Sequence, residues 1–259
     1  MANPRALITG ASSGIGRSYA EQLAAAGYDL VIVARRAERL NELAAALMDA
    51  HGAGVEVLPA DLSEAAGVRK VVERIASGAP LALVINNAGF ATRGPLATLD
   101  PEAFDSMLAV NITAVTHLSI AALKRMTADG AGAVINIASG TVFMQMPGNA
   151  GYGASKNYVT ALTRHMQVET AGANIRVQLL VPGIVATEFH SRMPTRPQFP
   201  PHLVMSADDV VRASLRALDM NEPVCFPSLP DIKDWDAYVA AERQIAAGAS
   251  RDKPASRYT

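Results

Sequence analysis

The residue types best suited to proton transfer in this sequence are a tyrosine and a lysine four positions apart. Tyr152 and Lys156 lie at the start of a predicted helix, so their side chains emerge on one face and can approach the same ligand. A free phenol has a pKa of about 10, too high for efficient proton exchange near neutrality, but a nearby ammonium favours the phenolate. Tyr152 is therefore a candidate general acid or base.

Two further polar residues are placed where they could meet the same ligand. Ser139 follows a predicted strand, and its hydroxyl could hold a substrate oxygen as charge develops in the transition state. Asn111 interrupts a long predicted helix, where we expect it to bond water or backbone at a local irregularity. Taken singly, each residue favours a structural explanation: a solvated helix face for Tyr152 and Lys156, a turn cap for Ser139, a satisfied core amide for Asn111. Their joint placement at the carboxyl ends of predicted parallel strands favours a ligand site.

The elements that position these residues follow a regular alternation. Short β-branched runs alternate with longer alanine-rich stretches, which is typical of βαβ units. The strands are almost continuously apolar, as expected when helices cover both faces of a sheet. We therefore predict an α/β fold, a Rossmann-type doubly wound parallel sheet with helices on both faces, as a single domain over 1–259. The expected strands are 5–9, 30–34, 55–59, 81–86, 133–138, 175–181 and 224–226, and the expected helices are 14–26, 37–50, 64–77, 101–127, 151–171, 207–218 and 235–246.

A glycine-rich turn directly follows the first predicted strand. Residues Thr9 to Gly16 read TGASSGIG, and a helical pattern begins at once. Such a turn lets backbone N–H groups and the helix dipole face a pyrophosphate, and glycine permits a close approach that a Cβ would block. The spacing differs from G-x-G-x-x-G and alone could mark a tight turn without a ligand. The strand–turn–helix context favours a dinucleotide site.

The end of the second predicted strand indicates which dinucleotide is preferred. NAD sites usually place a carboxylate there, whereas a 2′-phosphate needs a cation. This chain has Ala34 followed by Arg35 and Arg36, with Arg35 placed to fork onto a phosphate. Both arginines could instead lie on a solvated helix start and pair with Glu38. The missing acid and adjacent cations favour NADP(H), with NAD(H) as the second option.

Several separate motifs resemble the classical short-chain dehydrogenase/reductase family, over roughly residues 5 to 190. They are the T-G-x-x-x-G-x-G loop at Thr9 to Gly16, an adenine-side acid at Asp61 followed by Leu62, N-N-A-G at Asn86, Asn87, Ala88 and Gly89, Y-x-x-x-K at Tyr152 to Lys156, the catalytic Asn and Ser at Asn111 and Ser139, and a P-G segment at Pro182 and Gly183 with a later Thr187. No catalytic position departs from the family's pattern.

The resemblance implies a seven-stranded parallel sheet and an NAD(P)-dependent oxidoreductase acting on CH–OH groups. It implies that Lys156 holds the nicotinamide ribose and lowers the tyrosine pKa, and that Asn111 supports a water relay to Lys156. Ser139 would orient the carbonyl while Tyr152 exchanges the proton and hydride moves at nicotinamide C4. A homo-oligomer, tetramer or dimer, built on the long helices is also implied. The implied cofactor contacts are Gly10, Ser12, Ser13, Gly14, Ile15, Gly16, Arg35, Arg36, Asp61, Leu62, Asn87, Ala88, Gly89, Asn111, Tyr152, Lys156, Pro182, Gly183, Val185 and Thr187.

Residues 187–206 stand apart because they contain four prolines among large apolar side chains. A regular helix cannot run through the whole segment. A long apolar insertion after a sheet strand more often forms a lid or pocket wall than a plain surface connection, so we expect a mobile substrate loop. The expected substrate pocket, whose members could also serve ordinary core or oligomer packing, contains Phe90, Val142, Phe143, Met144, Phe189 and Met193.

Composition and charge limit the classes of partner that we expect this chain to bind. Half of the 259 residues are hydrophobic, 18% are charged and the net charge is -1, which supports a folded core and gives no basic excess for nucleic acid or anionic lipid. Cys225, the single cysteine, is expected on a buried strand. No leader pattern precedes the first strand, and the continuous apolar runs are too short to cross a bilayer as a helix. A cytoplasmic protein without a membrane partner is therefore expected. The five histidines show no metal-ligand spacing, so no metal is expected, and the tail 248–259 could be disordered or dock on a neighbouring subunit.

The main hypothesis is an NADP(H)-dependent oxidoreductase that reduces a small or medium hydrophobic carbonyl to an alcohol, or catalyses the reverse. The alternative is a catalytically silent dinucleotide-binding redox sensor, against which the intact Asn, Ser, Tyr and Lys argue. A third is an epimerase or dehydratase of the related extended group, but the glycine spacing and short C-terminal region fit the classical group better.

Overall fold

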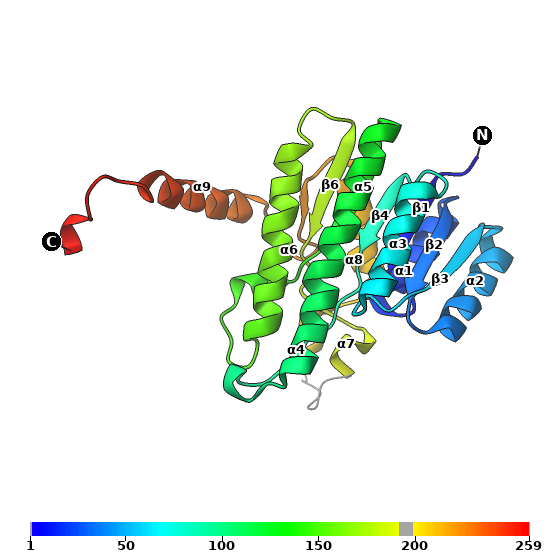
Figure 1. Ribbon diagram of the computed structural model, residues 1–259, viewed down its shortest axis with the longest axis horizontal. Helices are drawn as coiled ribbons and strands as arrows, with labels where there is room; N and C mark the ends of the chain where they lie inside the picture. Colours follow the sequence, from blue (N-terminus) through cyan, green and yellow to red (C-terminus); the bar gives the residue numbers. More distant parts are fainter. Residues whose placement is uncertain (1, 192–198, 259) are drawn as a thin grey trace. The chain divides into compact units, whose positions relative to one another are not determined.

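A computed structural model of the chain describes residues 2–191 and 199–258. Within them, seven strands form one sheet in the order β3-β2-β1-β4-β5-β6-β9, and every neighbouring pair is parallel (Figure 1). The order reverses direction between β1 and β4, as the predicted doubly wound fold requires. The strands are β1 (Arg5–Thr9), β2 (Asp29–Ala34), β3 (Val55–Pro59), β4 (Leu83–Asn86), β5 (Gly132–Ile137), β6 (Ile175–Leu180) and β9 (Val224–Cys225).

Helices cover both faces of this sheet, and each face has its own hydrophobic core. Helices α1 (Gly14–Ala25), α2 (Ala37–His51) and α8 (Ala207–Asp219) contribute to one core. Helices α3 (Ala65–Ser77), α5 (Val115–Asp129) and α6 (Ala150–Glu169) contribute to the other, and they lie in front of the sheet in Figure 1. The predicted fold class is confirmed.

Successive strand residues supply the two cores in turn. Ala6 and Ile8 of β1 pack in the core beneath α1, whereas Leu7 between them packs in the core beneath α3 and α5. Adjacent side chains in a strand point to opposite faces, so a strand covered on both sides must be apolar at every position. Cys225 of β9 follows the same rule and is a buried free thiol, as predicted.

The long helix expected over 101–127 is three segments: α4 (Pro101–Leu108), a π-helical stretch η2 (Ala109–Ala114) and α5. By length and composition alone, Pro101–Asp129 could cross a membrane, but half of its most apolar part is buried inside the fold. The core helix of a folded domain passes the same test, and Leu118, Ala122 and Met126 pack on the sheet here. The helix is therefore accounted for by the sheet that it covers.

The expected substrate loop is described at its two ends. After β6 the chain forms β7 (Ile184–Val185) and the single turn α7 (Glu188–Ser191), and it returns through η4 (Pro201–Leu203) to β8 (Val204–Met205). Strands β7 and β8 pair in parallel, which closes the base of the loop. Met193 lies outside the described residues.

The chain divides into two compact units, Met1–Pro227 and Ser228–Thr259. All strands and helices α1 to α8 belong to the first unit, so the doubly wound fold is one domain. The second unit holds α9 (Lys233–Gly248) and the short turn η5 (Ser256–Tyr258), and within it the rings of Trp235 and Tyr238 stack with centroids 5.4 Å apart. That one domain extends over 1–259 stays a prediction.

Candidate active site

The glycine-rich turn joins β1 to α1 at the carboxyl edge of the sheet. Gly10 and Gly14 adopt φ angles of +69° and +57°, a region that favours glycine. Gly16 faces the same turn so closely that an added Cβ would overlap the Gly10 carbonyl oxygen and the Asn87 amide nitrogen. The turn can pack this closely on its neighbours only because these side chains are absent. Ile15 packs against the core beside it.

The N-N-A-G segment after β4 is tied to this turn through Thr9. The Thr9 hydroxyl accepts hydrogen bonds from the backbone N–H groups of Asn87 and Ala88, at 2.9 and 3.0 Å. The Asn87 side chain donates to the Thr9 carbonyl oxygen at 2.8 Å. Two strand ends that are distant in sequence are thereby held as one rigid edge.

Three arginines lie near the end of β2, but they point to different partners. Arg35, the predicted phosphate fork, is 61% exposed and lies 3.7 Å from the Asp61 carboxylate. Partial burial raises the pKa of Asp61, but hydrogen bonds from Ser63 and the charge of Arg35 together lower it below its usual value. Leu62, the other predicted residue here, is buried in the core. Arg35 is thus directed toward Asp61.

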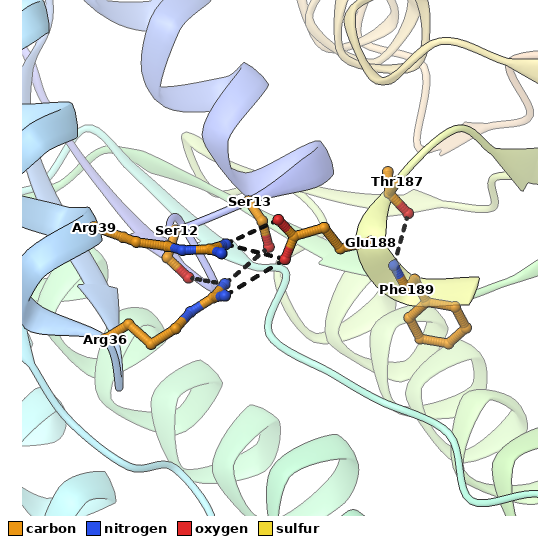
Figure 2. Close-up of polar contacts among 7 residues, drawn as sticks. All are labelled: Ser12, Ser13, Arg36, Arg39, Thr187, Glu188 and Phe189. Carbon is orange, nitrogen blue, oxygen red and sulfur yellow. Dashed lines mark hydrogen bonds and ion pairs between the residues drawn. The ribbon is translucent and has the colours of Figure 1, made fainter. Parts of the chain in front are cut away.

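Arg36 and Arg39, called here the arginine pair, converge above the glycine-rich turn (Figure 2). Arg36 donates to the hydroxyls of Ser12 and Ser13 at 2.9 and 3.3 Å. Both arginines also contact the carboxylate of Glu188, with nitrogen–oxygen distances of 3.4 Å for Arg36 and 2.8 Å for Arg39. Those hydrogen bonds and charges lower the pKa of Glu188. The pair therefore forms an anion-binding cluster beside two serine hydroxyls.

Sequence reasoning missed Arg39 and Glu188. Arg39 lies three residues after Arg36, a helical spacing that places two side chains on one face, and that signal was available. Glu188 offers no such signal because it is far away in sequence. A hollow of about 850 Å³ lies here, and its lining includes the Ser12 to Gly14 turn, Arg39 and residues 184–188.

Tyr152 and Lys156 are brought together on the first turns of α6, and both are buried, with 6% and 4% exposure. The solvated-helix-face alternative is thereby excluded. The Lys156 Nζ lies 5.9 Å from the centre of the Tyr152 ring and donates to the Ile137 carbonyl oxygen at 2.8 Å. Ser139 hydrogen-bonds the Tyr152 side chain and also accepts from the Thr141 N–H, which caps the short helix η3 (Gly140–Phe143). Ser139 thus both caps η3 and contacts the Tyr152 side chain.

Burial dominates the charge state of this pair. It raises the pKa of Tyr152 to about 12, while the Ser139 hydrogen bond and the charge of Arg93 act in the opposite direction. Burial also lowers the pKa of Lys156 to about 8. That Lys156 lowers the tyrosine pKa stays a prediction. Desolvation disfavours the charged form of each group.

Asn111 lies in the π-helical stretch η2 and is fully buried. Its Oδ1 accepts from the Phe90 N–H at 3.1 Å, and its Nδ2 donates to the Phe90 carbonyl oxygen at 2.9 Å and to the Ser155 hydroxyl at 3.0 Å. A Cβ added at Gly89 would lie 3.1 Å from Asn111 Oδ1 and 3.3 Å from Lys156 Nζ. The predicted helix irregularity is confirmed, and the amide ties the loop after β4 to α6.

The remaining predicted cofactor residues lie after β6. The Pro182 carbonyl oxygen accepts from Gly140 N–H at 2.8 Å, which joins the segment of Pro182 and Gly183 to the one that follows Ser139. Val185 is buried on β7. The Thr187 side chain faces Gly14, whose added Cβ would meet it at 3.0 Å, and its hydroxyl accepts from the Phe189 N–H at 3.3 Å (Figure 2). These residues therefore border the glycine-rich turn on one side and Ser139 on the other.

The expected substrate-pocket residues have different surroundings. The ring of Phe189 packs on that of Tyr152 with centroids 5.6 Å apart. Phe143 and Met144 are exposed, and Phe143 also contacts the ring of Phe226 at 6.0 Å. Val142 is buried, and Phe90 packs against the core beneath α3 and α5. Phe189 is the member seen beside the tyrosine.

Comparisons with known proteins agree with this geometry. A family model described as short chain dehydrogenase matches residues 4–197. Galactitol 2-dehydrogenase (L-tagatose-forming) of Cereibacter sphaeroides is 35% identical over 74% of this chain and 76% of its own, and sulfoacetaldehyde reductase 2 of Chromohalobacter salexigens is 34% identical over 71% and 73%.

Solved structures extend the likeness to the whole chain. A short-chain dehydrogenase from Sphingobium yanoikuyae in complex with NADPH has a TM-score of 0.94 and 38% identity, covering 98% of this chain and 100% of its own. The bulky-bulky ketone specific alcohol dehydrogenase of Comamonas testosteroni has a TM-score of 0.90 and 32% identity, covering 100% and 99%. The chain belongs to the short-chain dehydrogenase family and is an NAD(P)-dependent oxidoreductase acting on CH–OH groups.

Proposed function

We propose that this protein transfers hydride between NADP(H) and a carbonyl or alcohol carbon, with Tyr152 as the general acid or base. The observation that carries the proposal is the burial of Tyr152 against Ser139 and Phe189, with Lys156 on the next turn of the same helix. A buried, hydrogen-bonded phenol at the carboxyl edge of a parallel sheet is placed for proton exchange with a substrate oxygen.

The chain's own residues fit a dinucleotide. Glycines at three positions let the first turn fold tightly, and the turn leads into the backbone N–H groups that begin α1, where a pyrophosphate could bind. The arginine pair and the hydroxyls of Ser12 and Ser13 provide donors suited to a 2′-phosphate, with no carboxylate at the end of β2. The NADPH complex of the Sphingobium yanoikuyae relative supports the same preference. When bound, the cofactor would supply or accept the hydride.

Reduction is the direction to test first. With a pKa near 12, the phenol holds its proton at neutral pH and can donate it to a carbonyl oxygen that gains negative charge. The Ser139 hydroxyl, which already bonds this phenol, can donate to the same oxygen and orient it. Lys156 uses one N–H on the Ile137 carbonyl oxygen, which fixes the ammonium and leaves its other donors for the nicotinamide ribose.

The proposal is tested by following NADPH and NADH oxidation with a panel of ketones, aldehydes, quinones and oxo esters. Tyr152→Phe should reduce the rate with the best substrate by about 100-fold or more, because it removes the hydroxyl that exchanges the proton and keeps the ring. Tyr158→Phe is the matched control, since Tyr158 lies on the same helix, is partly exposed and bonds Thr116. Full activity in Tyr152→Phe would refute the assignment. Tight NADPH binding without turnover of any substrate would favour the silent dinucleotide sensor.

A further inference from the structure

Two loops meet at the carboxyl edge of the sheet beside Tyr152. The loop after β4 and the loop before α6 are joined by a hydrogen bond from Gly94 N–H to the Gly148 carbonyl oxygen, at 3.1 Å. A Cβ added at Gly148, whose φ is +73°, would contact the Gly94 backbone at 3.5 Å. Arg93 lies on one of these loops and Asn149 on the other, each adjacent in sequence to one of the two glycines.

Arg93 is a half-buried cation next to the reaction centre. Its Nε atom is buried and has no hydrogen-bond partner among the residues that the structure describes. Its charge reaches Tyr152, where it acts to lower the pKa of the phenol against the effect of burial. Buried N–H groups of arginine are costly to leave unpaired, so an arginine held in this way indicates an acceptor that binds from outside the chain.

Asn149, on the other loop, also has buried polar atoms without hydrogen-bond partners among the described residues. It is 3% exposed, and neither its Oδ1 nor its Nδ2 has a partner within the described parts of the chain. It stands at the N-cap of α6, but its side chain does not cap the helix. The side-chain amide of Asn149, one turn from Tyr152, is therefore available to bind a ligand.

We propose that Arg93 and Asn149 form a subsite for the carboxylate of an oxo acid substrate. The planar guanidinium matches a carboxylate in shape and charge, and the asparagine Nδ2 can donate a further hydrogen bond. Phe189 and the exposed Phe143 and Met144 leave apolar surface for the remainder of such a substrate. The inference rests on the proposed function and modifies it: the substrate carries an anionic group in addition to the apolar part expected from the sequence.

The first test compares an oxo acid with its neutral ester, benzoylformate and methyl benzoylformate, by kcat/KM with NADPH. Arg93→Met should lower the acid-to-ester ratio by about 10- to 100-fold, mainly through the KM of the acid, because the carboxylate loses a charge-assisted hydrogen bond. Any effect of the lost charge on Tyr152 acts on both substrates and cancels in the ratio. Arg93→Lys should restore part of the ratio, and Asn149→Ala should lower it less than Arg93→Met.

Arg212→Met is the matched control, because Arg212 is a surface arginine of α8 paired with Asp209. It should leave the acid-to-ester ratio unchanged. An equal ratio in the natural protein and Arg93→Met would overturn the subsite.

A binding measurement separates this inference from the proposed function. Benzoate carries the carboxylate but cannot be reduced, and its binding to the protein–NADPH complex is followed through nicotinamide fluorescence. Benzoate binding that is lost in Arg93→Met supports the subsite even where no carbonyl is turned over, a result that would count only against the proposed function. Carbonyl turnover with equal benzoate binding by both proteins leaves the proposed function standing and overturns the subsite.

Discussion

Replacing Asn111 with alanine tests whether this amide holds the site together. Asn111 is fully buried and makes three hydrogen bonds, two to the Phe90 backbone and one to the Ser155 hydroxyl. Ser155 in turn donates to the Tyr152 carbonyl oxygen at 2.8 Å, so the amide connects the loop after β4 with the helix turn that carries the tyrosine. The substitution removes this connection without adding volume.

The expected loss follows from these contacts. Each hydrogen bond contributes about 1 kcal/mol net, and the buried partners left unpaired add to the loss. Alanine regains roughly 0.5 kcal/mol through its higher helix propensity. We therefore expect Asn111→Ala to lower the free energy of unfolding by about 2–4 kcal/mol. A typical domain has about 5–15 kcal/mol, so the variant should still fold.

Equilibrium urea denaturation followed by far-UV circular dichroism measures the effect. With a slope of about 2–3 kcal/mol per molar urea, the midpoint should fall by roughly 1 M. Asn157→Ala is the control, because Asn157 is an exposed asparagine of α6 with one hydrogen bond, from its Nδ2 to the Gly153 carbonyl oxygen. Its midpoint should move little. If both variants unfold at the same urea concentration, the amide is not a structural tie.

Three further predictions concern the cofactor loop, the buried lysine and the arginine pair. Gly16→Ala should weaken NADPH binding at least tenfold, because the added methyl group overlaps the Gly10 carbonyl oxygen. Nicotinamide fluorescence measures the binding, and Gly248→Ala, whose added methyl group meets open space, is the control. The pKa of Lys156 is about 8 in the folded state and about 10.5 in the unfolded state. Between these pH values the folded state binds fewer protons than the unfolded state, so the free energy of unfolding should rise from pH 8 to pH 10. Lys156→Met should flatten that rise, and denaturation of both proteins at several pH values measures the difference. Glu188→Gln should lower the dissociation constant of NADPH severalfold and that of NADH less, since it removes a carboxylate that competes with phosphate for the arginine pair; equal changes for both cofactors would argue against that competition.

The sequence alone determined most of the architecture. The predicted limits of β1 and β3 match the structure, the helix predicted over 101–127 is three consecutive segments, and the other predicted elements differ by a few residues at their ends. These limits follow from hydrophobic period, β-branched runs and glycine turns, which are interactions between near neighbours in the chain. The same local logic placed the π-helical irregularity at Asn111 and the Tyr152–Lys156 pair on one helix face.

Side-chain partners were decided by tertiary structure. Arg36 and Arg39, and not Arg35, converge over the glycine-rich turn because Glu188, about 150 positions away, lies opposite them. The tyrosine pKa rises because tertiary packing buries the phenol, with the ring of Phe189 against it. Arg93 and Asn149 belong to two loops that a backbone hydrogen bond between Gly94 and Gly148 joins. Burial and charge pairing depend on which distant segments pack together, and no local pattern in a single sequence encodes that.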